Sequence, residues 1–211
     1  MKFTLGIKKN MGQIFDEDGK CYPVTLVSVG PITVIQVKTK EKDGYDAVQF
    51  GYGKKDLQRV GKPMAGKLAK ALKDKAVGFK YIKEWRLKDG DPNTMELKVG
   101  DVLDASVLVE GEKVNVSATS KGKGFQGVIK RHGFKGQPRT HGQKHCERAP
   151  GSIGGGLRNK VPKGMRMAGR MGSDRITVKN LVVMKVNKEA NEVLLRGAIP
   201  GNRGALVEIK N

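Results

Sequence analysis

The chain has 211 residues, a formal net charge of +20 and a pI near 10.0. This length suits one β-rich domain or two small ones. No apolar run approaches the roughly 20 residues of a membrane span, and the N-terminal residues lack the apolar stretch of a signal peptide. Cys21 and Cys146 are too few for a disulfide framework, so we expect free thiols in a reducing cytoplasm.

β-branched and alternating runs, divided by Gly-, Pro- and Asp-containing turns, predict strands in the first third of the chain. The predicted strands cover residues 3–9, 13–15, 24–29, 32–38 and 45–50. A short helix is predicted next, over residues 64–76, because Met64, Leu68 and Leu72 share one face at helical spacing. Its lysines are either solvated or in contact with phosphate. Trp85 falls in a further predicted strand, in a core or an interface.

Alternating apolar residues predict a half-buried hairpin over residues 103–118, with a turn at 109–112. Strand patterning resumes over residues 175–187, 192–199 and 205–210. One predicted strand therefore enters the segment 119–172 and another leaves it. The simplest architecture is a mainly β body, a barrel or curled sheet, formed by residues 1–118 and 173–211. A helix-containing insertion lies at about 55–100, and 119–172 is a long irregular excursion that we call the basic segment.

The basic segment holds 13 Lys or Arg, 13 Gly and one acidic residue, Glu147. Its apolar residues follow no period, so it has no means of burying a core of its own. Glycine lets the main chain approach a partner closely. A segment of this kind predicts a polyanionic partner, and a folded RNA fits best. The candidate RNA-binding residues are Lys121, Lys123, Lys130, Arg131, His132, Lys135, Arg139, His141, Lys144, Arg148, Ser152, Arg158, Lys160, Lys163, Arg166 and Arg170.

Two patterns in this segment have alternative interpretations. Residues 122–127 match G-x-G-x-x-G, but the glycine-broken sequence that follows does not favour the sheet-packed helix that a dinucleotide site requires, so no nucleotide cofactor is expected. His141, His145 and Cys146 lack the second ligand pair of a structural zinc site. Hydrogen bonding to RNA or to their own loop is the simpler role for these three side chains, and no metal is expected.

No nucleophile elbow or oriented acid–base pair is present, so an enzyme is not expected. Phe125 and Phe134 are the only aromatic residues of the basic segment. A platform for single-stranded bases would need more of them. Recognition through phosphates and RNA shape is therefore favoured over splayed bases.

The residues resemble a known family. Residues 120–131, SKGKGFQGVIKR, are similar to a signature of the large-subunit ribosomal protein L-three family, bacterial type. Further similar motifs, in the family's order, are DGYDAVQ at 43–49, THG at 140–142, RAPGSIG at 148–154, KGMRMAG at 163–169, VKNL at 178–181 and GAIPG at 197–201. The resemblance thus extends over essentially the whole chain.

This resemblance implies a six-stranded β-barrel of the translation-protein type and an extension that penetrates the large subunit toward the peptidyl transferase centre. It also implies binding to large-subunit rRNA near its 3′ end, an early role in assembly, and contacts of the barrel with neighbouring ribosomal proteins. The resemblance implies no cofactor, no small-molecule substrate and no binding to a membrane.

The sequence departs from the family pattern at several positions. His132-Gly133 replaces a Trp-Asn pair, Cys146-Glu147 replaces Ser-His, and Gly155 stands where many members carry a glutamine that can be methylated. Residues 157–162 also differ from the usual sequence. Two other functions remain open on sequence grounds: a free-standing RNA-binding or chaperone protein, and a nucleotide-dependent enzyme based on the glycine pattern alone.

Overall fold

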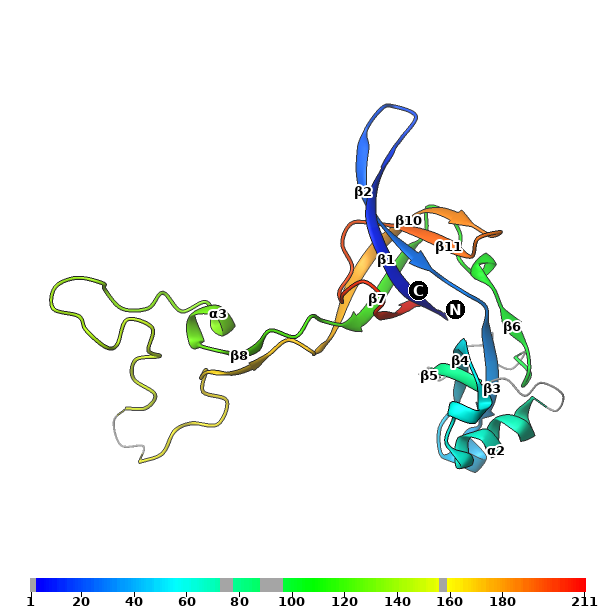
Figure 1. Cartoon of the computed structure of the whole chain (residues 1–211), viewed down its shortest axis with the longest axis horizontal. Helices are drawn as coiled ribbons and strands as arrows, with labels where there is room; N and C mark the ends of the chain where they lie inside the picture. The colour runs from blue at the N-terminus through cyan, green and yellow to red at the C-terminus, as the bar shows by residue number, and fades with distance from the viewer. Residues whose placement is uncertain (1–2, 73–77, 88–96, 156–158) are drawn as a thin grey trace. The chain divides into compact units, whose positions relative to one another are not determined.

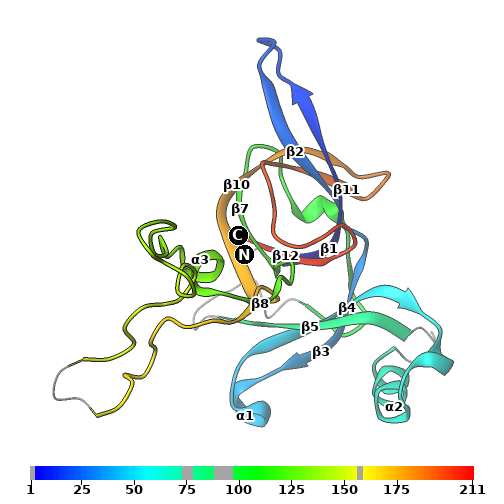
Figure 2. The same ribbon diagram turned by 60° about the vertical axis from the view of Figure 1, so that its left-hand side comes forward.

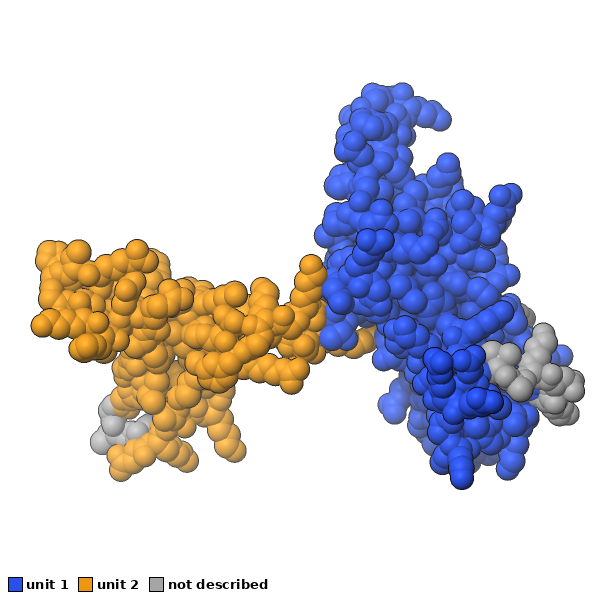
Figure 3. All heavy atoms as spheres, in the orientation of Figure 1, with its two compact units in different colours: residues 1–119, 176–211 blue, residues 120–175 orange. Residues whose placement is uncertain are grey.

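The chain forms two compact units, distinguished by colour in Figure 3. Unit 1 is Met1–Thr119 with Ile176–Asn211, and unit 2 is Ser120–Arg175. The structure is a computed structural model that describes residues 3–72, 78–87, 97–155 and 159–211. Within these residues, every helix is too short or too polar to cross a membrane.

Unit 1 is built around a closed barrel of six antiparallel strands in the order β1, β12, β7, β10, β11 and β2 (Figure 1). The mainly β fold and the six-stranded barrel predicted for this chain are thereby confirmed. Along each strand, alternate side chains point into the barrel, which is the pattern that the sequence carries. The strands are β1 Phe3–Phe15, β2 Cys21–Ser28, β7 Lys113–Thr119, β10 Arg175–Asn187, β11 Glu192–Arg196 and β12 Leu206–Lys210.

The barrel interior is filled by branched aliphatic side chains. Val116, Val183, Leu195 and Ile209 are fully buried within this cluster. Burying each such side chain stabilises the fold by about 1.5–3 kcal/mol. The packing is close at Gly6, where a Cβ would lie 2.6 Å from Cγ1 of Val27. Unit 1 therefore has a dense core of its own.

Strands β1 and β2 continue beyond the barrel as a projecting hairpin (Figures 1 and 2). The sequence predicts a break in the first strand at residues 10–12, and this prediction is wrong. β1 runs without interruption, and a shift of register between Lys8 and Met11 absorbs the irregular residues.

A second sheet of unit 1 has the strand order β5, β4, β3 and β6. Phe3 of β1 packs against this sheet, with its ring 5.2 Å from Phe50 and 5.3 Å from Trp85. Trp85 therefore contributes to a core, one of the two roles predicted for it. The strands are β3 Ile32–Lys38, β4 Ala47–Lys55, β5 Gly78–Arg86 and β6 Val102–Leu103.

The helices of unit 1 are short. α1 is Lys40–Asp43, η1 is Leu57–Arg59, and α2 is Lys62–Ala71, which packs through the buried Leu68. The predicted helix 64–76 thus begins two residues early, because Pro63 occupies its first turn. It ends before Leu72, which has a non-helical φ of −111°. Residues 73–76 of this prediction lie outside the described residues.

The predicted hairpin over residues 103–118 is wrong in its first strand and in its pairing, whereas its second strand is present as β7. β6 ends at Leu103 and pairs with β3, and a 3-10 helix, η3 Ala105–Val107, follows it. Ala105 and Leu108 are three residues apart, and both are buried in the barrel core. A single 3-10 turn therefore buries apolar residues whose alternation resembled a strand. β7 pairs instead with β12.

Candidate nucleic-acid interface

Unit 2 begins and ends with a two-stranded ribbon. β8 Gly124–Gln126 pairs with β9 Gly169–Met171 in antiparallel register, with Phe125 opposite Arg170. Main-chain bonds continue this pairing outside the strands, from Lys123 N to Met171 O (2.9 Å) and from Ser120 N to Asp174 O (2.8 Å). The two ends of the basic segment, about 50 residues apart in sequence, are thereby held side by side.

Gly172 permits the close approach of the two ribbon strands. Its φ is +79°, which side chains rarely adopt, and a Cβ there would lie 2.2 Å from the carbonyl oxygen of Lys121. No other residue type fits this position without displacing main chain.

A short helix, α3 Val128–His132, follows the ribbon and ends at Gly133, whose φ is +74°. The Arg131 guanidinium donates from Nη1 to the carbonyl oxygen of Met167 (2.7 Å), and Nε2 of His132 lies 3.0 Å from the same oxygen. Gly169 lies under the guanidinium, where a Cβ would come within 2.7 Å of Nη1. Two predicted RNA-binding side chains therefore join the outgoing and returning parts of the segment.

This helix corrects the analysis of residues 122–127, which predicts no helix after the glycine motif. A helix does begin at Val128, but it has only five residues. The preceding strand pairs with β9 alone, in a two-stranded sheet. A dinucleotide site needs a helix that packs on a larger parallel sheet, so the short helix does not restore that alternative.

Beyond α3, a loop closes around Glu147. Its carbonyl oxygen accepts a hydrogen bond from Gln137 N (2.9 Å), and its carboxylate pairs with Nε of Arg139 (2.7 Å). With its amide oxygen turned toward the main chain, Gln143 accepts from the N–H groups of Cys146 and Glu147 at 3.0 Å each. The one carboxylate of the basic segment is thus neutralised internally.

His141 occupies the tip of a turn within this loop. His141 and Gly142 have φ of 59° and 80°, and Gln143 N lies 3.5 Å from Thr140 O. Two successive positive φ values are typical of a type I′ turn. The His141 side chain is exposed there, so this turn presents it to solvent.

The predicted cations are mostly at the surface of unit 2. Arg131 and His132 are half-buried, and Arg158 lies outside the described residues. Arg139 is exposed although it pairs with Glu147. The remaining predicted residues are also exposed: Lys121, Lys123, Lys130, Lys135, His141, Lys144, Arg148, Ser152, Lys160, Lys163, Arg166 and Arg170.

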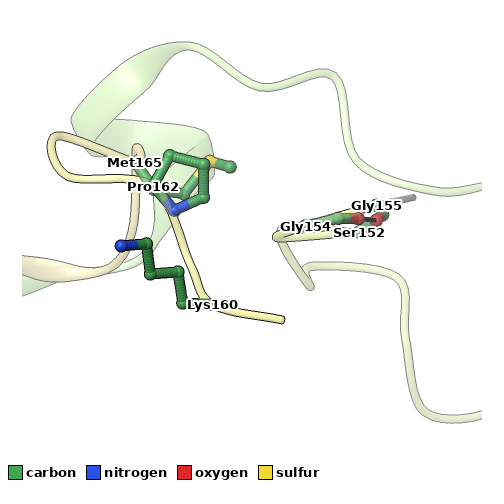
Figure 4. Close-up of a pocket in the computed structure, with 6 residues that line it drawn as sticks. All are labelled: Ser152, Gly154, Gly155, Lys160, Pro162 and Met165. Atoms are coloured by element: carbon green, nitrogen blue, oxygen red, sulfur yellow. Dashed lines mark hydrogen bonds between the residues drawn. The ribbon is translucent and has the colours of Figure 1, made fainter. Parts of the chain in front are cut away.

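A shallow hollow of about 320 Å³ lies in unit 2 (Figure 4). Ser152, Gly154 and Gly155 line it from one segment, and Lys160, Pro162 and Met165 line it from another. The Ser152 hydroxyl donates to the carbonyl oxygen of Gly154. Two of the predicted RNA-binding residues, Ser152 and Lys160, therefore share this hollow.

Some residues that hold unit 2 together carry no signal in the sequence. Met167 acts through its main-chain oxygen and Gln143 through its amide, and neither contact follows a sequence period. Glu147 did carry a signal, since it is the single acidic residue of the basic segment. Across the described part of the chain, no three His, Cys, Asp or Glu side chains gather in a way that would hold a metal ion.

Comparison with known proteins decides the family. The family model for ribosomal protein L3 matches residues 93–193. The large ribosomal subunit protein uL3 of Nocardia farcinica is 47% identical over 208 residues, covering 98% of this chain and 91% of its own. The chain belongs to the ribosomal protein L3 family. The uL3 protein of Roseiflexus sp. is 49% identical and covers 98% of this chain and 95% of its own. That of Acidothermus cellulolyticus is 46% identical and covers 100% of this chain and 92% of its own.

Two of the residues that depart from the motifs described under the sequence have partners within unit 2. His132 contacts the Met167 carbonyl oxygen. Glu147 is paired with Arg139. Each substituted side chain therefore has an internal partner within unit 2.

Proposed function

We propose that this chain is a structural, non-enzymatic constituent of the large ribosomal subunit and that unit 2 binds its rRNA. The relatives described above are named as large ribosomal subunit proteins. The observation that carries the proposal is the charge of unit 2, which has 14 Lys or Arg and two acidic residues. Unit 1, which is much longer, has 27 Lys or Arg and 19 acidic residues. A polyanion is the partner that this imbalance favours.

The proposed binding mode is neutralisation of phosphates by exposed cations along two arms of unit 2. The outgoing arm is residues 121–131, and the returning arm is residues 163–170. Lys121, Lys123 and Lys130 lie on the outgoing arm, and Lys163 and Arg170 lie on the returning arm. Such contacts position a protein on RNA without reading its sequence. Specificity then comes from fit to the folded RNA, and the ribbon, helix α3 and the Glu147 loop, once ordered in the complex, supply the shape.

In this proposal the arms anchor the protein and the distal part supports nearby RNA. The distal part, residues 145–159, holds two cations, Arg148 and Arg158, and four glycines. Following the family resemblance, we propose that the protein binds near the 3′ end of 23S-type rRNA and acts early in assembly. The distal part then supports the peptidyl transferase centre, the barrel contacts neighbouring large-subunit proteins, and the protein works in the cytoplasm with the ribosome.

A sedimentation experiment tests this proposal. The tagged full chain, expressed in bacteria, is expected to sediment with large subunits and to remain there after a high-salt wash, because the folded rRNA surrounds its cations. A free-standing RNA-binding or chaperone protein would be washed away. Recovery of the chain only in the soluble fraction would overturn the ribosomal assignment.

A further inference from the structure

One apolar side chain of unit 2 is displayed to solvent. Phe125 is 77% exposed, the highest value among the large hydrophobic residues of the described chain, where Phe15 follows at 62%. Leaving such a ring in water forgoes the free energy that its burial would contribute. Single exposed apolar residues are common on protein surfaces, so the surroundings of Phe125 decide what this exposure means.

The main chain holds Phe125 in a fixed place. It is the central residue of β8 and faces Arg170 across the ribbon. The ribbon is closed by the bond from Lys123 N to Met171 O and by the close approach at Gly172. Directly opposed residues of an antiparallel pair project from the same face, so the ring and the Arg170 guanidinium share one side of the ribbon. A ring held in this way loses little freedom when it binds.

The charge around the ring selects its partner. Arg170, opposite Phe125 in the ribbon, is exposed, and so are Lys121 and Lys123, which precede Phe125 in the sequence. No acidic residue occurs between residues 120 and 147 or between 147 and 174. An apolar side chain of another protein would cover the ring but would leave these cations without counter-charges. A nucleotide satisfies both requirements, since its base has an apolar π-face and its phosphates carry negative charge.

We propose that Phe125 is a base-stacking residue, whose ring stacks on one unpaired nucleobase of the bound RNA while Lys123 and Arg170 neutralise the adjoining phosphates. This inference rests on the proposed RNA-binding function of unit 2. Stacking of a base on an aromatic side chain contributes about 1–3 kcal/mol. One such contact adds specificity for an extruded base to an interface that otherwise acts on phosphates and shape.

Affinity measurements on the full chain with protein-free large-subunit rRNA test the stacking contact. We expect Phe125→Ala to weaken binding roughly 5- to 150-fold with an unchanged salt dependence. Phe125→Leu should weaken binding nearly as much, because leucine is apolar but has no π-face. Phe125→Trp, which keeps a π-face, should bind rRNA as tightly as the wild type. If Phe125→Leu binds as the wild type does, the ring does not stack and the proposal is overturned.

Fluorescence provides a second readout that does not depend on affinity. The chain has a single tryptophan, Trp85, which packs on Phe3 in unit 1. An indole introduced by Phe125→Trp should be quenched on rRNA binding, whereas one introduced by Val109→Trp, at an exposed position of unit 1, should not. Absence of quenching at position 125 while salt-dependent binding persists would overturn the stacking proposal and leave the proposed function standing. Absence of rRNA binding at low salt would overturn both.

Discussion

The two units of this protein use different sources of order. Unit 1 buries branched aliphatic and aromatic side chains in a barrel and against a second sheet. Unit 2 contributes Val128 as its one buried hydrophobic residue among those described, and hydrogen bonds to main-chain oxygens hold it together. Because each of these bonds replaces a hydrogen bond to water in the unfolded chain, its net contribution to stability is modest. We therefore expect unit 1 to fold by itself and unit 2 to gain its full order from a partner.

Removing cations from unit 2 should have the largest effect. In equilibrium binding to protein-free rRNA, outside the assembled subunit, we expect the wild-type chain to lose on the order of a thousandfold or more in affinity between 50 and 200 mM salt. Substituting alanine for Lys121, Lys123, Lys130 and Lys163 should lower the salt slope by about four. Affinity at 100 mM salt should fall on the order of a thousandfold, which filter binding can measure.

The matched control removes four exposed lysines from unit 1, namely Lys54, Lys55, Lys62 and Lys70. If phosphate binding belongs to unit 2, affinity should change by only about a fewfold, a through-space effect of net charge. An equal loss in both variants would mean that these lysines of unit 1 also contact phosphate and that the two units share the interface.

The second-largest effect is expected from a cavity in the barrel core. Leu195 is fully buried among barrel residues, so Leu195→Ala should lower the free energy of unfolding by about 2–5 kcal/mol. Urea denaturation followed by Trp85 fluorescence measures this in unit 1. Ile153→Ala, at a 38% exposed site in unit 2, should change it by less than about 0.5 kcal/mol. Similar losses in both variants would contradict a core confined to unit 1.

The ribbon of unit 2 can be opened at one position. Gly172→Ala places a Cβ 2.2 Å from Lys121 O at a strained φ, a cost of about 1–3 kcal/mol. Exchange of the Lys123 amide hydrogen should become roughly tenfold faster or more, with unit 1 unchanged. Gly154→Ala, which meets no atom within 4 Å, is the control. Unaltered exchange in the Gly172 variant would show that the close approach does not hold the ribbon.

The smallest effect is expected from the Glu147 carboxylate. Its pair with Arg139 is exposed, with 80% and 43% of the two side chains accessible, and such pairs contribute about 0–1 kcal/mol. Glu147→Gln removes a negative charge and releases Arg139, so rRNA affinity at low salt should rise about two- to fivefold. Glu189→Gln makes the same charge change at an exposed site of unit 1 and should have no such effect. Weaker binding by Glu147→Gln would mean that the loop shape matters more than the charge.

The sequence predicts the barrel well because its strands alternate strictly, as at Val114, Val116 and Ala118. It fails at residues 103–109, since one 3-10 turn buries Ala105 and Leu108 as effectively as a strand would. In unit 2 the composition identifies the candidate cations. It does not reveal that Arg131 bonds to Met167, because a side-chain contact to a main-chain oxygen 36 residues away leaves no periodic signal.

Hydrogen exchange of the full chain, free and bound to large-subunit rRNA, tests the contrast between the units most directly. In the free protein, amides of β7, β11 and β12 should be strongly protected, whereas those of the described residues between Gly133 and Ala168 should exchange nearly as fast as an unfolded chain. On rRNA binding, only the second group should gain protection. Strong protection of residues 133–155 in the free protein, unchanged by rRNA, would contradict this account.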